Sequence, residues 1–287
     1  MTTIHPPDSV RIALLQASDA PALGELLDTN PRGTLYLRSL VHEHGAAPTD
    51  RADHGRFIGA FRDRKLAAVL FQGNSRNLCS EGDPALLERL VREGLTGTAP
   101  RLFVGPAEHA DMIRLGFNRF GTSPFLDRNQ TYYVLTPETL AEIEPIEVSH
   151  ARPEWIEPIT RAHAAMTEED LCIPRHALDL GRLREIAAGR IRAGKVWVVM
   201  DGEHLLCKVE DSGRTPDGVL VGGVYTEPEM RGRGYATRCL ATWARMLFAS
   251  GVEFLALHVN SVNHPAVRAY ENVGFRRHRM LRMLLSF

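Results

Sequence analysis

The chain has 287 residues, of which 44% are hydrophobic and 24% charged, values typical of a globular protein with a buried core. Its formal net charge is -1, so no overall field favours nucleic acid or an anionic membrane. No run approaches the roughly 18 apolar residues of a membrane helix, and residues 1–7 lack the features of a secretory signal. We therefore expect a cytoplasmic protein with no nucleic-acid and no membrane partner.

The cysteines and histidines do not form a pattern typical of a metal centre. The four cysteines share no CxxC or zinc-ribbon spacing and are interpreted as reduced structural thiols: Cys79, Cys172, Cys207 and Cys239. His42 and His44 are two residues apart, which differs from the spacing of a helical zinc site. We therefore predict no metal.

The length suits two domains, and the first half alternates between strand and helix patterns. Strands are predicted over 10–15, 57–61, 65–72, 101–104 and 131–135, and helices over 20–27, 36–42, 83–95 and 108–115. Asp83 followed by Pro84 is typical of a helix start, and Gly116 of a helix end. The acidic, proline-containing stretch 136–146 is predicted to connect the domains, which we place at 1–140 and 146–287.

The second half shows a similar succession of patterns. Helices are predicted over 153–166, 178–193, 235–250 and 265–273, and strands over 195–200, 204–209, 219–226, 254–259 and 275–285. Asp201 and Gly202 indicate a hairpin turn between the first two strands. A weak internal repeat relates Leu115-Gly116-Phe117 to Val273-Gly274-Phe275, each after a strand and a helix. Duplication of one α/β unit explains this repeat, and chance similarity is the alternative.

The strongest motif follows the strand 219–226 and precedes the helix 235–250. Gly232 and Gly234 permit a tight turn and a close approach to a ligand. The helix start presents unpaired N–H groups that favour a pyrophosphate, and Arg231 and Arg233 add positive charge. A turn that binds nothing is the structural alternative. The spacing fits neither a P-loop nor a dinucleotide-binding fingerprint.

In detail, the segment from Arg231 to Ala236 resembles the (Q/R)-x-x-G-x-(G/A) loop of the GNAT acyltransferases. A second block resembles the ending of the same family and comprises Leu257, Val259, Asn263, Ala266, Tyr270, Gly274 and Phe275. The resemblance implies an α/β GNAT fold, with a mixed, mainly antiparallel central sheet flanked by helices. It also implies an N-acetyltransferase that uses acetyl-CoA as the acyl donor and transfers the acetyl group directly in a ternary complex.

The resemblance assigns roles to individual positions. Coenzyme A binding is expected at Val224, Tyr225, Thr226, Arg231, Gly232, Arg233, Gly234, Tyr235, Ala236, Thr237, Asn263 and Ala266. Asn263 is also a helix cap on its residue type alone. Tyr270 would protonate the departing thiolate; otherwise it is a half-buried aromatic residue. An oxyanion donor is expected among the backbone N–H groups near Val224 or Tyr225.

The general base is less well defined by the sequence. Glu227 is the residue that we select, while Glu229, Glu210 and a base acting through ordered water remain alternatives. Each of these carboxylates, taken alone, is more simply explained as a solvated group.

The first half departs from the family pattern. Residues 73–79, between the strand pair and the helix 83–95, lack the glycine loop, and Met112 stands where the second half has Tyr270. This arrangement resembles tandem two-domain acyltransferases, similar to glycine N-acyltransferases, with a degenerate first copy. Such a copy would shape the acceptor site or a dimer.

The acceptor is expected to be a primary amine on a small molecule, an amino acid or a protein, and a homodimer is one candidate assembly. The acidic residues Glu168, Glu169 and Asp170 favour a cationic acceptor or else form a solvated loop. The main alternative function is a non-catalytic module that binds acyl-CoA as a sensor. A nucleotide-binding oxidoreductase is a third hypothesis, and the loop spacing disfavours it.

Overall fold

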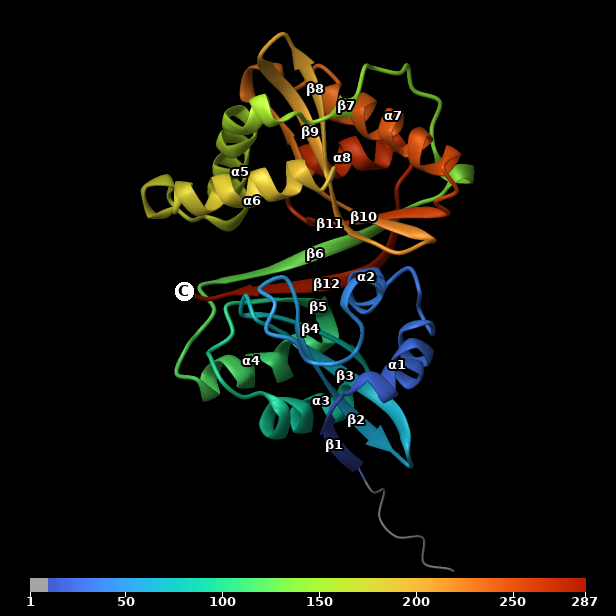
Figure 1. The fold of residues 1–287 in the computed structure, drawn as a ribbon, viewed down its shortest axis with the longest axis vertical. Coiled ribbons are helices and arrows are strands. Elements are labelled where there is room, and N and C mark those ends of the chain that lie inside the picture. The colour runs from blue at the N-terminus through green and yellow to red at the C-terminus, as the bar shows by residue number, and fades with distance from the viewer. Residues whose placement is uncertain (1–9) are drawn as a thin grey trace, which may run out of the picture. The chain divides into compact units, whose positions relative to one another are not determined.

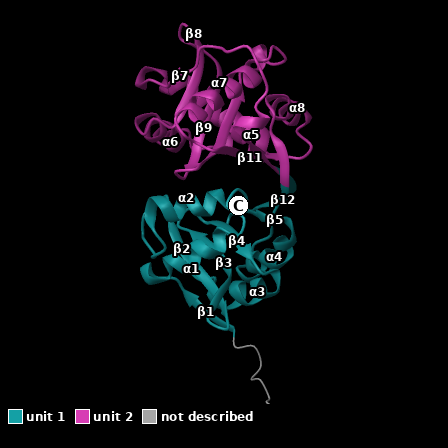
Figure 2. Ribbon diagram, turned by 90° about the vertical axis from the view of Figure 1, so that its right-hand side faces the viewer, with its two compact units in different colours: residues 1–131, 279–287 teal, residues 132–278 magenta. Residues whose placement is uncertain are grey.

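The computed structural model describes residues 10–287, which form two compact units (Figures 1 and 2). The first unit extends to residue 131 and also contains residues 279–287, and the second comprises residues 132–278. Residues 1–7, for which we predicted no secretory signal, lie outside the described residues. Within residues 10–287, no helix is both long and apolar enough to cross a membrane.

The strands of the first unit follow the order β1-β2-β3-β4-β5-β12. Their bounds are β1 (Val10–Leu14), β2 (Gly55–Arg62), β3 (Lys65–Gly73), β4 (Asn77–Gly82), β5 (Leu102–Pro106) and β12 (Arg276–Leu285). The helices are α1 (Ala20–Leu27), α2 (Leu35–His44), α3 (Pro84–Arg89) and α4 (Ala110–Arg119). All pairs are antiparallel except the parallel pair β4–β5.

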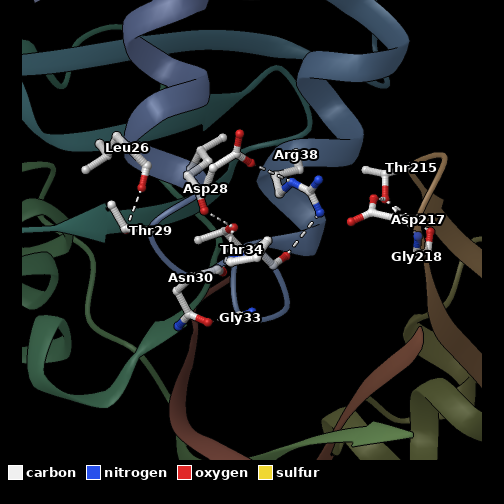
Figure 3. A network of polar contacts seen from close by, with 12 residues as sticks. Leu26, Asp28, Thr29, Asn30, Gly33, Thr34, Arg38, Thr215, Asp217 and Gly218 are labelled. Atoms are coloured by element: carbon white, nitrogen blue, oxygen red, sulfur yellow. Dashed lines mark hydrogen bonds and ion pairs between the residues drawn. The ribbon is translucent and has the colours of Figure 1, made fainter. Parts of the chain in front are cut away.

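Alternating side chains of β2 and β3 build two cores, one on each face of the first unit's sheet. Phe57 and Phe71 pack with α1 and α2, whereas Ile58 and Leu70 pack with α3 and α4. This alternation is the period-two pattern of a strand that is covered on both faces. Between α1 and α2 the chain is held locally, because the Thr34 hydroxyl donates to the Asn30 carbonyl oxygen at 3.0 Å (Figure 3).

Three predictions for the first half were wrong in detail. The stretch 77–82, for which no strand was predicted, is the strand β4, so that only Asp83 separates β4 from α3. The helix predicted over 83–95 is α3 followed by a π-helical turn, Leu90–Gly94. Helix α4 runs through Gly116, which does not adopt the left-handed conformation that ends a helix. The absence of a side chain there instead lets Leu95 and Val91 approach closely.

The strands of the second unit follow the order β6-β11-β10-β9-β8-β7. They are β6 (Leu126–Leu135), β7 (Ser149–His150), β8 (Val196–Asp201), β9 (His204–Arg214), β10 (Gly218–Thr226) and β11 (Phe254–Asn260). The helices are α5 (Ile156–Leu171), α6 (Leu180–Arg192), α7 (Tyr235–Ala249) and α8 (His264–Val273). Strands β10 and β11 are parallel, and the described pairs β7–β8, β8–β9 and β9–β10 are antiparallel.

Helices cover both faces of this second sheet (Figure 1). Cys207 and Val209 of β9 share a core with residues of α7 and α8, whereas Val196 and Val198 of β8 pack with residues of α5 and α6. Because successive strand residues alternate, Lys208 on β9 lies on the face opposite Cys207 and Val209. The turn from β9 into β10 is closed by Thr215, whose hydroxyl donates to Asp217 at 2.7 Å (Figure 3).

The mixed α/β fold with a central sheet flanked by helices is as predicted. The division into units differs from the predicted domains, because β6 and β12 each contain a unit boundary. The predicted connection 136–146 belongs to the second unit, where Leu140, Ile143 and Ile146 pack on its core. Both halves of the chain show the same succession β-α-α-β-β-β-α-β-α-β.

Candidate active site

The two parallel strands in the middle of the second unit separate after a short pairing. The ladder of β10 and β11 joins Gly218, Val219 and Leu220 to Phe254, Leu255 and Ala256, and it stops there. From Val221 onward, this edge of β10 has no strand partner in the described chain. Its free N–H and C=O groups can therefore pair with an extended ligand, as in strand addition.

A β-bulge interrupts β10 on its other side, towards β9. The register passes from Gly222 opposite Glu210 to Tyr225 opposite Lys208, so Gly223 and Val224 face a single residue of β9. Gly223 has φ +56°, and a Cβ atom there would lie 2.6 Å from the carboxyl carbon of Glu210. Only glycine fits both the backbone conformation and the space.

The loop that follows β10 ends at an open helix start. Gly232 and Gly234 have φ +75° and +79°, in the left-handed region that favours glycine. Gly234 is the N-cap of α7, and no side chain caps the first turn. Open space surrounds both glycines, so backbone conformation and not crowding selects them. The N–H groups at this helix start are therefore available to an anion.

The two arginines of the loop differ in their surroundings. Arg231 donates to both carboxyl oxygens of Glu169, at 2.8 and 3.0 Å, and its guanidinium lies 5.5 Å from the ring centre of Tyr225. Its Nε donates to the carbonyl oxygen of Thr226 at 3.1 Å, so Arg231 holds the loop against the end of β10. Arg233 is exposed and has no ion-pair partner in the described chain. Arg233 is thus the loop cation that is free to meet a ligand.

Helix α8 carries the second group of predicted residues. Asn263 is its N-cap and accepts from the N–H of Ala266 at 3.3 Å, as expected of a capping asparagine. Ala266 packs on the main core of the unit, to which the 8%-exposed Tyr270 belongs. Burial raises the pKa of Tyr270 above its usual value, and Asp170 and Cys207 raise it further. Tyr270 therefore keeps its proton at neutral pH.

Glu227 directly follows β10 and is half-buried. Burial raises its pKa, with Glu229 and Glu169 acting in the same direction and Arg161 and Arg231 opposing them. A carboxylate with a raised pKa is better matched to accept a proton near neutral pH than a solvated one.

Sequence reasoning missed a cluster of charged side chains on the α5–α6 face. Lys208 is fully buried, and Glu210 is 3% exposed rather than solvated as expected. Glu210 bonds to Lys208, to His163 at 2.5 Å and to Arg190 at 2.7 Å. The signal available in the sequence was the pair Lys208 and Glu210, two apart within an apolar strand, which places both on one face.

Burial alone would raise the pKa of Glu210, but Lys208, His163 and Arg190 outweigh it and hold the pKa far below its usual range. A carboxylate stabilised in this way is a poor proton acceptor, which argues against Glu210 as the base. Within residues 10–287, no group of three or more His, Cys, Asp or Glu side chains is arranged to hold a metal ion.

This geometry, an open strand edge beside an uncapped helix start, can accommodate an extended ligand with an anionic group. The model of the acetyltransferase (GNAT) family matches residues 141–275. The chain therefore carries a GNAT acetyltransferase domain over these residues. No curated protein matches the sequence.

Solved structures similar to this chain share its fold over nearly the whole length. An acetyltransferase of the GNAT family from Colwellia psychrerythraea is 14% identical with a TM-score of 0.56, covering 96% of this chain and 99% of that chain. A Drosophila protein is 14% identical with a TM-score of 0.67, covering 97% and 98%. A GCN5-related N-acetyltransferase from Sphaerobacter thermophilus is 16% identical with a TM-score of 0.55, covering 97% and 95%.

Proposed function

We propose that the protein is an N-acyltransferase that moves the acetyl group of acetyl-CoA to a primary amine. The observation that carries this proposal is the uncapped start of α7 beside the unpaired edge of β10. The two features offer N–H donors for a pyrophosphate and a backbone ladder for the amide-containing arm of the same ligand. The amine belongs to a small molecule, an amino acid or a protein.

In this proposal the pyrophosphate lies at the first turn of α7, formed by Tyr235, Ala236 and Thr237, with Arg233 beside it. The pantetheine arm extends along β10 from Val221 to Thr226, and its thioester reaches the bulge. The left-handed backbone of Gly232 and Gly234 orients the loop for this contact. Asn263 and Ala266 line the start of α8 on the other side of the arm.

The acyl donor supplies an electrophilic thioester carbon, and the amine nitrogen attacks it with its lone pair. As the C–N bond forms, the carbonyl electrons move to oxygen, where an N–H of the bulge stabilises the charge. Glu227 accepts the proton that the amine loses. The C–S bond then breaks, and Tyr270 donates a proton to the departing thiolate.

The acidic residues at the end of α5 are exposed, and one of them is already paired with a cation of the chain. Glu169 is paired with Arg231, and Glu168 accepts from the backbone N–H of Arg175 at 3.4 Å. We therefore propose no preference for a cationic acceptor from these residues.

The first unit is proposed to be a degenerate copy that does not bind acyl-CoA at its corresponding helix. The shared order of elements supports the duplication, and α3 is the helix that corresponds to α7. At the start of α3, Asp83 accepts from the N–H of Ala85 at 2.9 Å and pairs with Arg62 at 2.7 Å. A carboxylate thus already occupies the position that a pyrophosphate needs.

Calorimetric titration of the full chain with acetyl-CoA and, separately, with NAD tests the proposal. Saturable binding of acetyl-CoA, together with CoA release in the presence of a panel of primary amines, is expected. Binding of acetyl-CoA without release of CoA across a broad panel of amines would favour the non-catalytic sensor. Binding of NAD would favour the oxidoreductase. Sedimentation of the same sample would report whether the homodimer forms.

A further inference from the structure

The buried ion cluster beside the bulge of β10 is costly for the fold. Transferring an ammonium and a carboxylate out of water costs several kcal/mol per ion, and apolar residues of similar volume often serve stability as well. Lys208 is nevertheless fully buried, on the same face of β9 as Glu210. Stability therefore does not account for a charged side chain at position 208.

Lys208 makes a second contact that an apolar residue would not make. Its ammonium donates to the carbonyl oxygen of Gly223 at 2.8 Å, within the bulge. Bulge residues lose their regular ladder partners, so the orientation of this peptide is not set by strand pairing alone. The lysine therefore determines which way the carbonyl of Gly223 faces.

The rigid peptide unit transmits this orientation to the next N–H group. A trans peptide is planar, and its C=O and N–H bonds point in opposite directions. When the ammonium of Lys208 holds the carbonyl of Gly223, the N–H of Val224 is directed away from that ammonium. The edge of β10 that faces away from β9 has no partner strand from Val221 onward in the described chain, so a ligand along this edge can meet that N–H.

The rest of the cluster keeps Lys208 in place. Glu210 accepts from the ammonium and is itself fixed by His163 and Arg190. The backbone of Gly223 passes so close to Glu210 that a Cβ atom would overlap its carboxyl group, at 2.6 Å. The glycine at the bulge and the charged pair on β9 are thus fitted to each other.

We propose that Lys208 is a positioning residue for acyl transfer, which orients the Gly223–Val224 peptide so that its N–H donates to the acyl carbonyl oxygen. This inference rests on the proposed function and specifies which backbone donor stabilises the oxyanion. Loss of one such donor typically lowers turnover by about 10²–10³-fold. The resemblance implies a donor near Val224 or Tyr225, and the new elements are the choice of the Val224 N–H and the role of Lys208 in orienting it.

The test uses Lys208→Met in the full chain, because methionine has a similar length and cannot donate. Three quantities are measured: the Kd of acetyl-CoA, kcat, and the infrared carbonyl band of bound acetyl-CoA labelled with ¹³C at the carbonyl carbon. We expect a nearly unchanged Kd, a kcat lowered by about 10²-fold or more, and a carbonyl band shifted back towards its position in water. Lys65→Met, at an exposed position on β3, should change none of them.

A second variant separates positioning from packing. Glu210→Gln disrupts the ion cluster but leaves the bond from Lys208 to Gly223, so the carbonyl band should stay at its wild-type position. If Glu210→Gln moves the band as far as Lys208→Met does, the effect belongs to the cluster as a whole and the proposal is wrong. Should Lys208→Met fail to fold, the double variant Lys208→Met, Glu210→Gln removes both charges and is expected to show the same band shift.

The outcomes distinguish this inference from the proposed function. If the wild-type protein binds and turns over acetyl-CoA while Lys208→Met retains both kcat and the carbonyl band, the positioning role is overturned and the function stands. If the wild-type protein does not bind acetyl-CoA, the proposed function fails and the inference fails with it.

Discussion

Tyr270 combines burial with a raised pKa, so that its hydroxyl group stays protonated until negative charge develops nearby. Replacing it with phenylalanine removes the proton and little volume. We expect Tyr270→Phe to lower kcat by about 10²-fold or more, the usual worth of a general acid, while the Kd of acetyl-CoA changes little. Steady-state kinetics and calorimetry on the same preparation measure both effects.

Tyr133→Phe is the matched control for this prediction. Tyr133 is a buried tyrosine of β6 whose hydroxyl donates to Glu271 at 2.8 Å. Its loss should cost roughly 1 kcal/mol of stability and leave kcat nearly unchanged. Equal kcat values for Tyr270→Phe and the wild-type protein at every pH would remove Tyr270 from the mechanism.

His258 on β11 makes stability depend on pH in the acidic range. Burial lowers its pKa from 6.5 to about 4. Between these values the unfolded chain binds a proton that the folded chain does not, so stability falls as the pH decreases from 6.5 towards 4. The loss from this one group is about 1.4 kcal/mol per pH unit.

Urea unfolding at several pH values measures this slope. His258→Asn should reduce this slope between pH 6.5 and 4 by up to about 1.4 kcal/mol per pH unit, because the share of His258 is then lost. His204→Asn, at an exposed hairpin position, should leave the slope unchanged. An unaltered slope in His258→Asn would assign the acid sensitivity to other groups.

Single residues differ in how well the sequence predicted them. The capping role of Asn263 follows from a local rule, and the structure confirms it. The ligand contact expected of Arg231 stays a prediction, and the sequence did not indicate that its guanidinium binds Glu169, which is distant in sequence. Lys208 and its partners from α5 and α6 were missed, because their contacts depend on tertiary packing that no local pattern reports.

Among elements, the loop from β10 to α7 depends most directly on backbone conformation. Gly234 has φ +79°, and a side chain there would be strained even though space is open. We expect Gly234→Ala to weaken acetyl-CoA binding by about 10-fold or more. A displaced loop that loses about 1.4 kcal/mol of binding free energy already lowers the affinity tenfold. Calorimetric titration of the variant measures the change.

The other end of α7 supplies the control. Gly251 has φ +96° and open surroundings, so Gly251→Ala introduces comparable backbone strain just beyond the C-terminus of the helix. Both variants should lose a similar amount of thermal stability, and only Gly234→Ala should lose affinity. Equal affinities for the two variants would show that the loop does not contact the ligand.

The sequence predicted elements well where a strong pattern coincided with local stop signals. The ranges expected for α7 and β10 agree with the structure to within a residue at each end. Strand β4 was missed, because its sequence Asn-Leu-Cys-Ser-Glu-Gly is polar and its conformation depends on pairing with β3 and β5. The bulge at Gly223 was also not predicted from the sequence. A glycine within a strand can mark a bulge, a bend or the close approach of another group, and the sequence does not distinguish these.

At the scale of the whole molecule, the predicted boundary followed a proline-rich, acidic stretch, whereas the compact units follow packing. Tyr133 and Leu135 precede that stretch and are fully buried in the core of the second unit. Leu284 lies near the end of the chain and is fully buried in a core of the first unit. Local composition does not report which core a strand joins, so the sequence could not place these residues.

Fragments of the second unit should therefore differ in stability according to whether they contain the end of β6. The predicted domain 146–287 lacks Tyr133 and Leu135, and removing a buried side chain of this size costs about 2–5 kcal/mol each. Because a whole domain is stable by only about 5–15 kcal/mol, we expect fragment 146–287 to be largely unfolded and 132–278 to unfold cooperatively.

Fragment 132–287 is the control, since it restores the β6 residues while keeping residues 279–287, and its stability should match that of 132–278. Urea unfolding followed by circular dichroism measures all three, and equal midpoints for 146–287 and 132–278 would mean that β6 contributes little to this core.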